Sequence, residues 1–320
     1  MTAPTAFRSP LAEAMELFVA FKRMQGYEYS HQAGMLGYFD CFLLGRDCAD
    51  GLLRPAHFDA YLATTAGLCH STREGRLSVV RQFSCHLHAY HPESAVVPAR
   101  LLPRHCRSIR FRRIEPEQVR ELMDAAARLR PKRSVRPPCI RFLIGLLYTT
   151  GLRIGEALQL NLEDIDHRNG TLFVRRGKFG KERLVALADT TLGALDVWLH
   201  LRSRHASASP SAPLLAGRPN TRLTYCQAKY AFGTLCRQCG LEGQPPPRLH
   251  DLRHNFACRC IGCWREEGKD VDVLLPVLAN AMGHVDIFTT QIYIHIEAAS
   301  LHEASDRLLE HVGQQRETER

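Results

Sequence analysis

The sequence has no run of about 18 apolar residues, the length that a membrane-spanning helix needs. Residues 1–21 also lack the basic segment followed by an apolar stretch that marks a secretory signal. No internal repeat or extended low-complexity tract is present. These absences argue against a membrane, repeat or fibrous protein, and they predict a globular protein of the cytoplasm.

A disulfide framework is also missing. The twelve cysteines are scattered along 320 residues, whereas disulfide frameworks are typical of small secreted chains. We therefore expect reduced, mostly buried thiols, and no cofactor. The alternative is a zinc site of four thiolates, because Cys236 and Cys239 form a CxxC pair and Cys260 and Cys263 form a second one further along.

The charge balance favours a polyanionic partner. Lysine and arginine number 42 against 33 aspartate and glutamate residues, which leaves a formal net charge of +9. An excess of this size is compatible with binding to DNA, although it does not identify a partner. The chain is 45% hydrophobic and 23% charged, as in globular proteins, and it is long enough for two domains.

Residues 1–92 are predicted to form a helical domain. Apolar residues recur at spacings of three and four in four segments, residues 12–24, 30–46, 55–65 and 71–90. The following residues, 93–113, are rich in proline and arginine and show no periodicity. We expect them to form a basic linker that can lie along a phosphate backbone.

Residues 114–296 are predicted to form a second domain of mixed structure. Helical periodicity occurs in five segments, residues 115–129, 139–166 with a break at Thr-Thr-Gly, 190–204, 224–240 and 248–267. Two strand-like runs flank the turn GKFGKE, so residues 171–187 should form a β-hairpin. The predicted fold class is mainly α with a small β-hairpin or sheet (α+β). Residues 297–320 carry an apolar stripe and should form a C-terminal helix or tail.

Four stretches carry residues that are capable of chemistry, namely TTGLRIGEALQL, GKFGKERLVAL, LHDLRHNFA and GHVDIFTTQIY. Each has an ordinary explanation. Arg153 and Glu156 could form an i,i+3 ion pair, and the hairpin lysines could be solvated turn charges. His250 and Arg253 could cap a helix, and Tyr293 could fill a core.

Together these stretches could cleave a phosphodiester without a metal. Arg153 and Arg253 could bind the non-bridging oxygens and neutralise the charge of the transition state. His250 lies on the same helical face as Arg253 and adds a proton-transfer group. Nearby cations and a base would activate the hydroxyl of Tyr293 as a nucleophile, while a hairpin lysine could protonate the leaving oxygen. The sequence has no carboxylate cluster that suits a two-metal nuclease.

The four stretches occur in the order of the motifs of the tyrosine recombinases of the phage integrase and Xer type, and they resemble those motifs over about residues 112–300. The first resembles the family's first arginine box, and the second its G-K-x-x-K-E-R turn. HDLRH is similar to the H-x-L-R-H box, and GHVDIFTTQIY to the G-H-x-x-x-x-T-T-x-x-Y box. The resemblance implies six catalytic residues, Arg153, Lys178, His250, Arg253, His284 and Tyr293.

The family mechanism implies that Tyr293 attacks a DNA phosphate to form a 3′-phosphotyrosyl intermediate and a free 5′-hydroxyl, without metal or ATP. Arg153 and Arg253 would clamp the phosphate, His284 would hydrogen-bond it, and His250 would assist proton movement at the nucleophile. Lys178 would be the general acid, with Lys181 as the alternative. Glu156 would orient Arg153.

The resemblance also implies partners and leaves rival functions open. Double-stranded DNA would be clamped between the catalytic domain and an N-terminal core-binding domain. The free protein would be a monomer and would assemble into a tetramer on DNA. In this tetramer the C-terminal helix would dock on a neighbouring protomer. Related recombinases or DNA-bending accessory proteins could take part at the nucleoid. The lengthened segment between Arg253 and Gly283, with Pro276 inside it, suggests an altered helix or loop and transposition by a mobile genetic element. The alternatives are a type IB topoisomerase-like enzyme and a non-catalytic DNA-binding protein.

Overall fold

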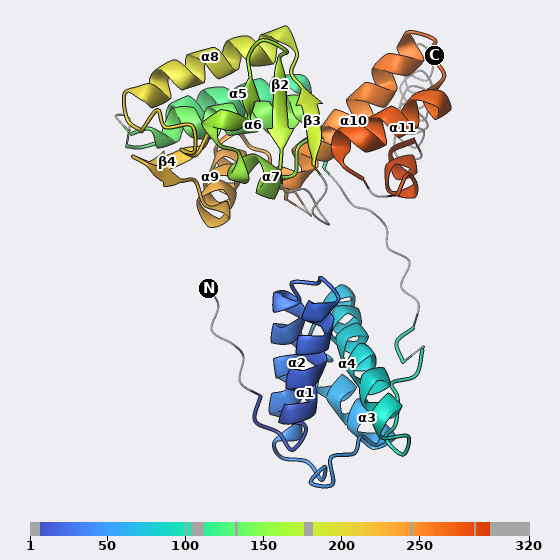
Figure 1. Cartoon of the computed structure of the whole chain (residues 1–320). Helices are drawn as coiled ribbons and strands as arrows, with labels where there is room; N and C mark the ends of the chain where they lie inside the picture. Colours follow the sequence, from blue (N-terminus) through green and yellow to red (C-terminus); the bar gives the residue numbers. More distant parts are fainter. Residues whose placement is uncertain are drawn as a thin grey trace, which may run out of the picture. The chain divides into compact units, whose positions relative to one another are not determined.

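The computed structural model describes residues 7–99, 101–103, 112–131, 134–175, 182–243, 246–284 and 286–294. The chain divides into two compact units, Met1–Ser108 and Ile109–Arg320 (Figure 1). The expected tail, 297–320, lies outside the described residues, and so do Lys178 and Lys181 of the hairpin turn. The expected domain bounds therefore stay predictions.

The described residues of the N-terminal unit form four helices, α1 (Ala12–Met24), α2 (Ser30–Leu43), α3 (Pro55–Thr64) and α4 (His70–Tyr90). Aromatic side chains join them in one core: the ring centroids of Phe18 and Phe83 lie 5.7 Å apart, and those of Phe39 and Tyr61 lie 4.9 Å apart. The four predicted helical segments are thus confirmed to within a few residues, because each carries a local apolar face.

The described helices of the C-terminal unit are α5 (Pro116–Ala127), α6 (Arg136–Thr150), α7 (Ile154–Gln159), the short 3₁₀ helix η1 (Leu162–Asp164), α8 (Asp189–Ser203), α9 (Tyr225–Gln238), α10 (Leu249–Glu266) and α11 (Val271–Met282). Its strands are β1 (Ile165–Asp166), β2 (Thr171–Val174), β3 (Arg183–Ala186), β4 (Ala216–Arg218) and β5 (Thr221–Arg222). The predicted mainly α fold with a small sheet is confirmed.

The predicted hairpin is β2 and β3, which pair antiparallel with Leu172 opposite Val185. Both side chains are buried, so this register turns an apolar face toward the helices. The short strand β1 extends the hairpin to three strands, and β4 pairs with β5 in a second small sheet. Neither β1 nor the second sheet was predicted, because strands of two or three residues carry no periodic signal.

Helix α6 runs through the centre of the C-terminal unit and packs against α5, α8 and α10 (Figure 1). Ten of its fifteen residues are buried, and they lie on several sides of the helix. A helix that is enclosed in this way has weak apolar periodicity, because it has no single apolar face. The helix ends at Gly151 in the left-handed conformation, with φ of +63°. The chain leaves α6 at this glycine, and two residues later Arg153 caps the start of α7.

Helix α11 lies directly before His284, in the segment where an altered helix or loop was expected. It begins at Asp270, whose side chain accepts hydrogen bonds from the N–H groups of Asp272 and Val273, and it ends at Gly283 with φ of +65°. Pro276 lies inside this continuous helix. Within the described part of the chain, no helix is both long and apolar enough to cross a membrane.

Candidate active site

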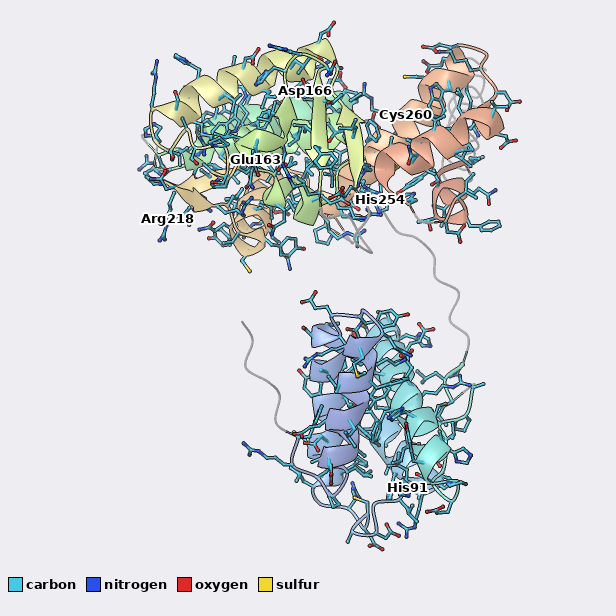
Figure 2. The ribbon with its side chains drawn as sticks, viewed as in Figure 1. His91, Glu163, Asp166, Arg218, His254 and Cys260 are labelled. Carbon is cyan, nitrogen blue, oxygen red and sulfur yellow. The ribbon has the colours of Figure 1, made fainter. Side chains whose placement is uncertain are left out.

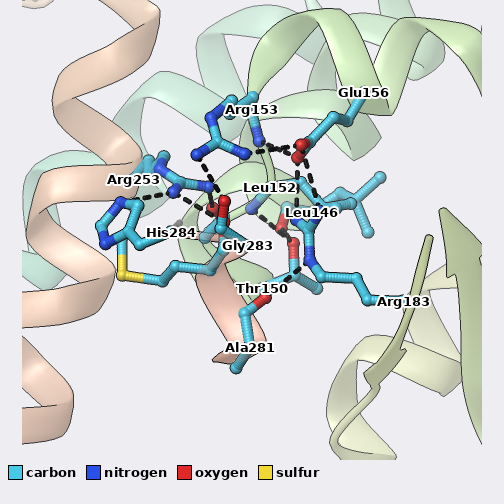
Figure 3. Close-up of polar contacts among 12 residues, drawn as sticks. Leu146, Thr150, Leu152, Arg153, Glu156, Arg183, Arg253, Ala281, Gly283 and His284 are labelled. Atoms are coloured by element: carbon cyan, nitrogen blue, oxygen red, sulfur yellow. Dashed lines mark hydrogen bonds and ion pairs between the residues drawn. The ribbon is translucent and has the colours of Figure 1, made fainter. Parts of the chain in front are cut away.

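Three consecutive carbonyl groups at the C-terminal end of α11 bind three arginines (Figure 3). The pairs are Ala281 with Arg183 Nε at 2.9 Å, Met282 with Arg253 Nη2 at 2.7 Å, and Gly283 with Arg153 Nη2 at 2.8 Å. The last carbonyls of a helix have no partner within the helix and carry its negative dipole end, so they attract cations. The end of α11 thereby brings together β3, α10 and the start of α7.

Glu156 lies between two of these arginines and is 6% exposed. Its carboxylate accepts hydrogen bonds from Arg153 Nη1 at 2.8 Å and from both terminal nitrogens of Arg183 at 3.1 and 2.8 Å. Burial acts to raise the pKa of Glu156, but hydrogen bonds from Arg183 and Arg153 outweigh it and lower this pKa to about 2. The carboxylate is therefore ionised at neutral pH and holds both guanidinium groups. The expected Arg153–Glu156 ion pair is formed.

Arg253 is 1% exposed and contacts His284. Its Nη2 lies 2.8 Å from His284 Nε2, while His284 Nδ1 lies 2.7 Å from Thr290 Oγ1. A guanidinium has donors only, so Nε2 accepts, and Nδ1 carries the proton and donates it to Thr290. Burial, followed by the charges of Arg253 and Arg153, lowers the pKa of His284 to about 3. Burial and the charge of Arg153 lower the pKa of Arg253 to about 10, which leaves it charged at neutral pH.

Tyr293 lies on a short helix at residues 288–294 and is 2% exposed. Asp286 caps this helix by accepting a hydrogen bond from the N–H of Phe288 at 3.0 Å. The Tyr293 hydroxyl lies 2.8 Å from Nδ1 of His254, a residue of α10 that is labelled in Figure 2. Burial raises the pKa of Tyr293 to about 12, although Arg253 acts to lower it. Burial and the neighbouring His250 lower the pKa of His254 to about 4.

His250 lies in the first turn of α10 and is exposed at its outer face. Its ring centroid lies 4.6 Å from that of His254. The protein around the ring lowers the pKa of His250, and the charge of Arg253 adds to this effect. Among the contacts of the described residues, the imidazole bonded to the Tyr293 hydroxyl belongs to His254 and not to His250.

Five of the expected site residues thus come together from three separate stretches of the chain, namely Arg153, Glu156, Arg253, His284 and Tyr293. Sequence reasoning missed two others, Arg183 and His254. The available signals were the arginine of GKFGKERLVAL and the second histidine of HDLRH. Lys178 and Lys181 lie outside the described residues, and β3 begins with Arg183 two positions after Lys181.

The structure does not bring the cysteines of the alternative zinc site together. Across the ranges that the structure describes, no three histidine, cysteine or acidic side chains are grouped to hold a metal ion. Cys236 and Cys239 belong to the core around α6, whereas Cys260, labelled in Figure 2, packs with α11 and Tyr293. Burial raises the pKa of Cys236 to about 12 and that of Cys260 to about 11, so both thiols are protonated at neutral pH.

Buried arginines, a neutral histidine and a tyrosine hydroxyl on a mainly helical scaffold are groups suited to phosphodiester chemistry. Residues 112–300 match the model of the phage integrase family. The chain belongs to this family, the tyrosine recombinases, which are DNA strand-transferring enzymes.

Relatives and solved structures agree with this assignment. The chain is 34% identical over 302 residues to y4rE of Sinorhizobium fredii, whose name assigns it to the integrases/recombinases, and the match covers 91% of this chain and 93% of y4rE. It is 32% identical over 195 residues to the tyrosine recombinase XerA of Pyrococcus furiosus, covering 60% of this chain and 59% of that protein.

Two solved structures share the fold. The Tn1549 transposon integrase in complex with transposon right end DNA has a TM-score of 0.63 at 15% identity, covering 91% of this chain and 98% of that chain. The XerH site-specific recombinase bound to its difH substrate has a TM-score of 0.61 at 19% identity, covering 95% of this chain and 96% of that chain.

Proposed function

We propose that this chain performs site-specific DNA recombination with Tyr293 as the nucleophile that forms a 3′-phosphotyrosyl intermediate. The observation that carries the proposal is that Arg153, Arg253 and His284 lie together with Tyr293. The centroid of the Tyr293 ring lies 6.4 Å from that of His284, and the Tyr293 hydroxyl is hydrogen-bonded to the neutral imidazole of His254. The phosphotyrosyl ester conserves the energy of the broken bond, so that rejoining needs no ATP.

The arginines would bind the phosphate through the same donors that now hold carbonyl groups. Arg153 is the more accessible of the two, with 23% of its side chain exposed, and would make the first contact. Arg253 is occupied by Met282 and His284 and would gain a phosphate oxygen only when these partners yield. DNA binding must therefore uncover both Arg253 and the hydroxyl of Tyr293.

Proton transfer would take place at two positions, at the leaving 5′-oxygen and near the nucleophile. Lys178, or Lys181 in its place, would protonate the leaving 5′-oxygen from the hairpin turn. His250 is exposed next to His254 and would exchange protons between the site and solvent. His284 is neutral and would hydrogen-bond the phosphate once its Nε2 separates from Arg253 and carries the proton, with Nδ1 then accepting from the Thr290 hydroxyl.

The proposed partner is double-stranded DNA. A tetramer of this protein would bind the DNA in the cytoplasm, at the nucleoid. The net charge of +9 and the DNA in the XerH and Tn1549 integrase structures support this assignment. The N-terminal helical unit would serve as the core-binding part of the clamp, and residues 297–320 would dock on a neighbouring protomer. Strong salt dependence of DNA binding is expected from the phosphate contacts.

A suicide DNA duplex that is nicked near the cleavage site tests the proposal. The wild-type protein should form a covalent adduct that survives a denaturing gel, whereas Tyr293→Phe should form none. Tyr230→Phe is the matched control because this tyrosine is 70% exposed on α9, and it should leave the adduct unchanged. Adduct formation by Tyr293→Phe would overturn the assignment of the nucleophile.

A second assay separates recombination from its rivals. A recombinase should exchange the sequences that flank its sites, whereas a type IB topoisomerase-like enzyme would relax supercoiled plasmid without exchange. Arg153→Ala should bind DNA but cleave it about 100-fold more slowly, since it removes a donor to the developing charge. A protein that binds DNA and forms no adduct in any variant would be the non-catalytic alternative.

A further inference from the structure

Three histidines lie near the Tyr293 hydroxyl, and their hydrogen bonds decide which of them can take its proton. His284 is excluded because its Nε2 accepts from Arg253 and its Nδ1 donates to Thr290. His250 makes no hydrogen bond to the hydroxyl among the contacts of the described residues. Nδ1 of His254 lies 2.8 Å from the hydroxyl oxygen, within the distance for direct proton transfer.

We propose that His254 is a further catalytic residue, which accepts the proton of Tyr293 during cleavage and returns it during rejoining. The inference rests on the proposed role of Tyr293. The Oη–H bond breaks and its proton passes to His254 Nδ1, while Oη forms the bond to phosphorus. The P–O5′ bond breaks with its electron pair on O5′, which takes a proton from the general acid of the hairpin.

The surroundings of His254 suit this step. In the absence of DNA the His254 imidazole is neutral and can accept a proton, and the Tyr293 hydroxyl is protonated and can donate one. The charged or titratable groups around the imidazole are Arg248, His250, Asp251, Arg253, His284 and Tyr293. An arriving phosphate adds negative charge to this cationic cluster, which favours the imidazolium that forms during the attack.

The contact can persist when DNA uncovers the tyrosine. Tyr293 belongs to one buried apolar cluster with Ala257, Cys258 and Ile261 of α10, and these residues follow His254 at helical spacing on one face. Any movement that keeps this packing also keeps the hydroxyl beside His254. The proton acceptor is thus carried on the helix against which the nucleophile rests.

The nicked suicide duplex provides the test, with His254→Ala and His254→Gln compared with wild type at saturating DNA. Glutamine retains an oxygen that can accept a hydrogen bond but does not take up a proton. Both variants should bind DNA and cleave it at least about 100-fold more slowly than wild type. Cleavage by His254→Gln at the wild-type rate would overturn the proposal and leave His254 only an orienting contact.

A substrate with sulfur in place of the 5′-bridging oxygen separates the two proton transfers. A thiolate leaves without protonation, so this substrate should restore cleavage to Lys178→Ala but not to the His254 variants. Restoration of the His254 variants would place His254 on the leaving-group side and overturn the proposal. Thermal unfolding of both variants checks their fold, and adduct formation by Tyr293→Phe would instead reject the proposed nucleophile itself.

Discussion

Arg183 of β3 and Glu156 of α7 form a buried, two-pronged ion pair, with Arg183 Nη1 3.1 Å from Oε1 and Nη2 2.8 Å from Oε2. The same carboxylate binds Arg153, and Arg183 Nε also binds the carbonyl of Ala281. Arg183 thus links the hairpin, the start of α7 and the end of α11. It positions Arg153 through Glu156.

Replacing Arg183 with alanine should destabilise the protein by about 3 kcal/mol, because it leaves the Glu156 charge buried with half of its partners. It should also slow DNA cleavage while DNA binding is retained, since Arg153 loses its fixed orientation. Urea unfolding and the nicked duplex measure the two effects. The matched control is Arg141→Ala, which breaks an exposed ion pair with Asp124 and should cost less than about 1 kcal/mol. Equal losses in the two variants would contradict this account.

Replacing Thr290 with valine should reduce cleavage about tenfold. Valine keeps the shape but leaves the buried Nδ1–H of His284 without its acceptor, a cost of about 1 to 3 kcal/mol. Thr289→Val is the adjacent control, because Thr289 is exposed, and it should cleave normally. A normal rate for Thr290→Val would show that His284 needs no such support.

Replacing Gly151 with alanine should disrupt both stability and the site. The residue has φ of +63°, and an added Cβ would clash with the Phe256 ring. The left-handed conformation alone costs an alanine about 1 to 2 kcal/mol, and displacement of Phe256 would disturb α10. Gly155→Ala is the control, since its Cβ meets nothing within 4 Å on α7, and it should be neutral or stabilising. Thermal unfolding of the pair should separate the two outcomes clearly.

Acid should destabilise the protein below about pH 6.5 because two half-buried histidines, His254 and His284, are neutral in the folded protein. The pKa of His254 is lowered to about 4 and that of His284 to about 3, whereas the unfolded chain binds protons near pH 6.5. The unfolded state therefore holds more protons between these values, and the stabilisation that is present above pH 6.5 is lost as the pH falls toward 4. In urea titrations from pH 7.5 to 5, His254→Gln/His284→Gln should show a shallower loss of unfolding free energy. An unchanged slope would refute the assignment.

The sequence alone predicted the class of the fold and most residues of the candidate site. Helices such as residues 12–24 follow from local apolar spacing, and Arg153, Arg253, His284 and Tyr293 lie in local motifs. The strand β1 and the pair β4–β5 could not be predicted, because two or three residues of strand are stabilised only by their partners. The four helices of the N-terminal unit were predicted from periodicity alone, without any motif that would assign a role to them.

Only the tertiary structure decided which groups touch which. In the sequence Arg183 is one arginine of a basic turn, and His254 is the second histidine of a motif that already supplies His250. Arg183 binds Glu156, which lies 27 residues away in the sequence, and His254 binds Tyr293, which lies 39 residues away. The physical reason is that hydrogen bonding and burial depend on distance in space and not in the sequence. The carbonyl groups at the end of α11 bind the arginines, and the position of Tyr293 beside α10 places its hydroxyl at His254.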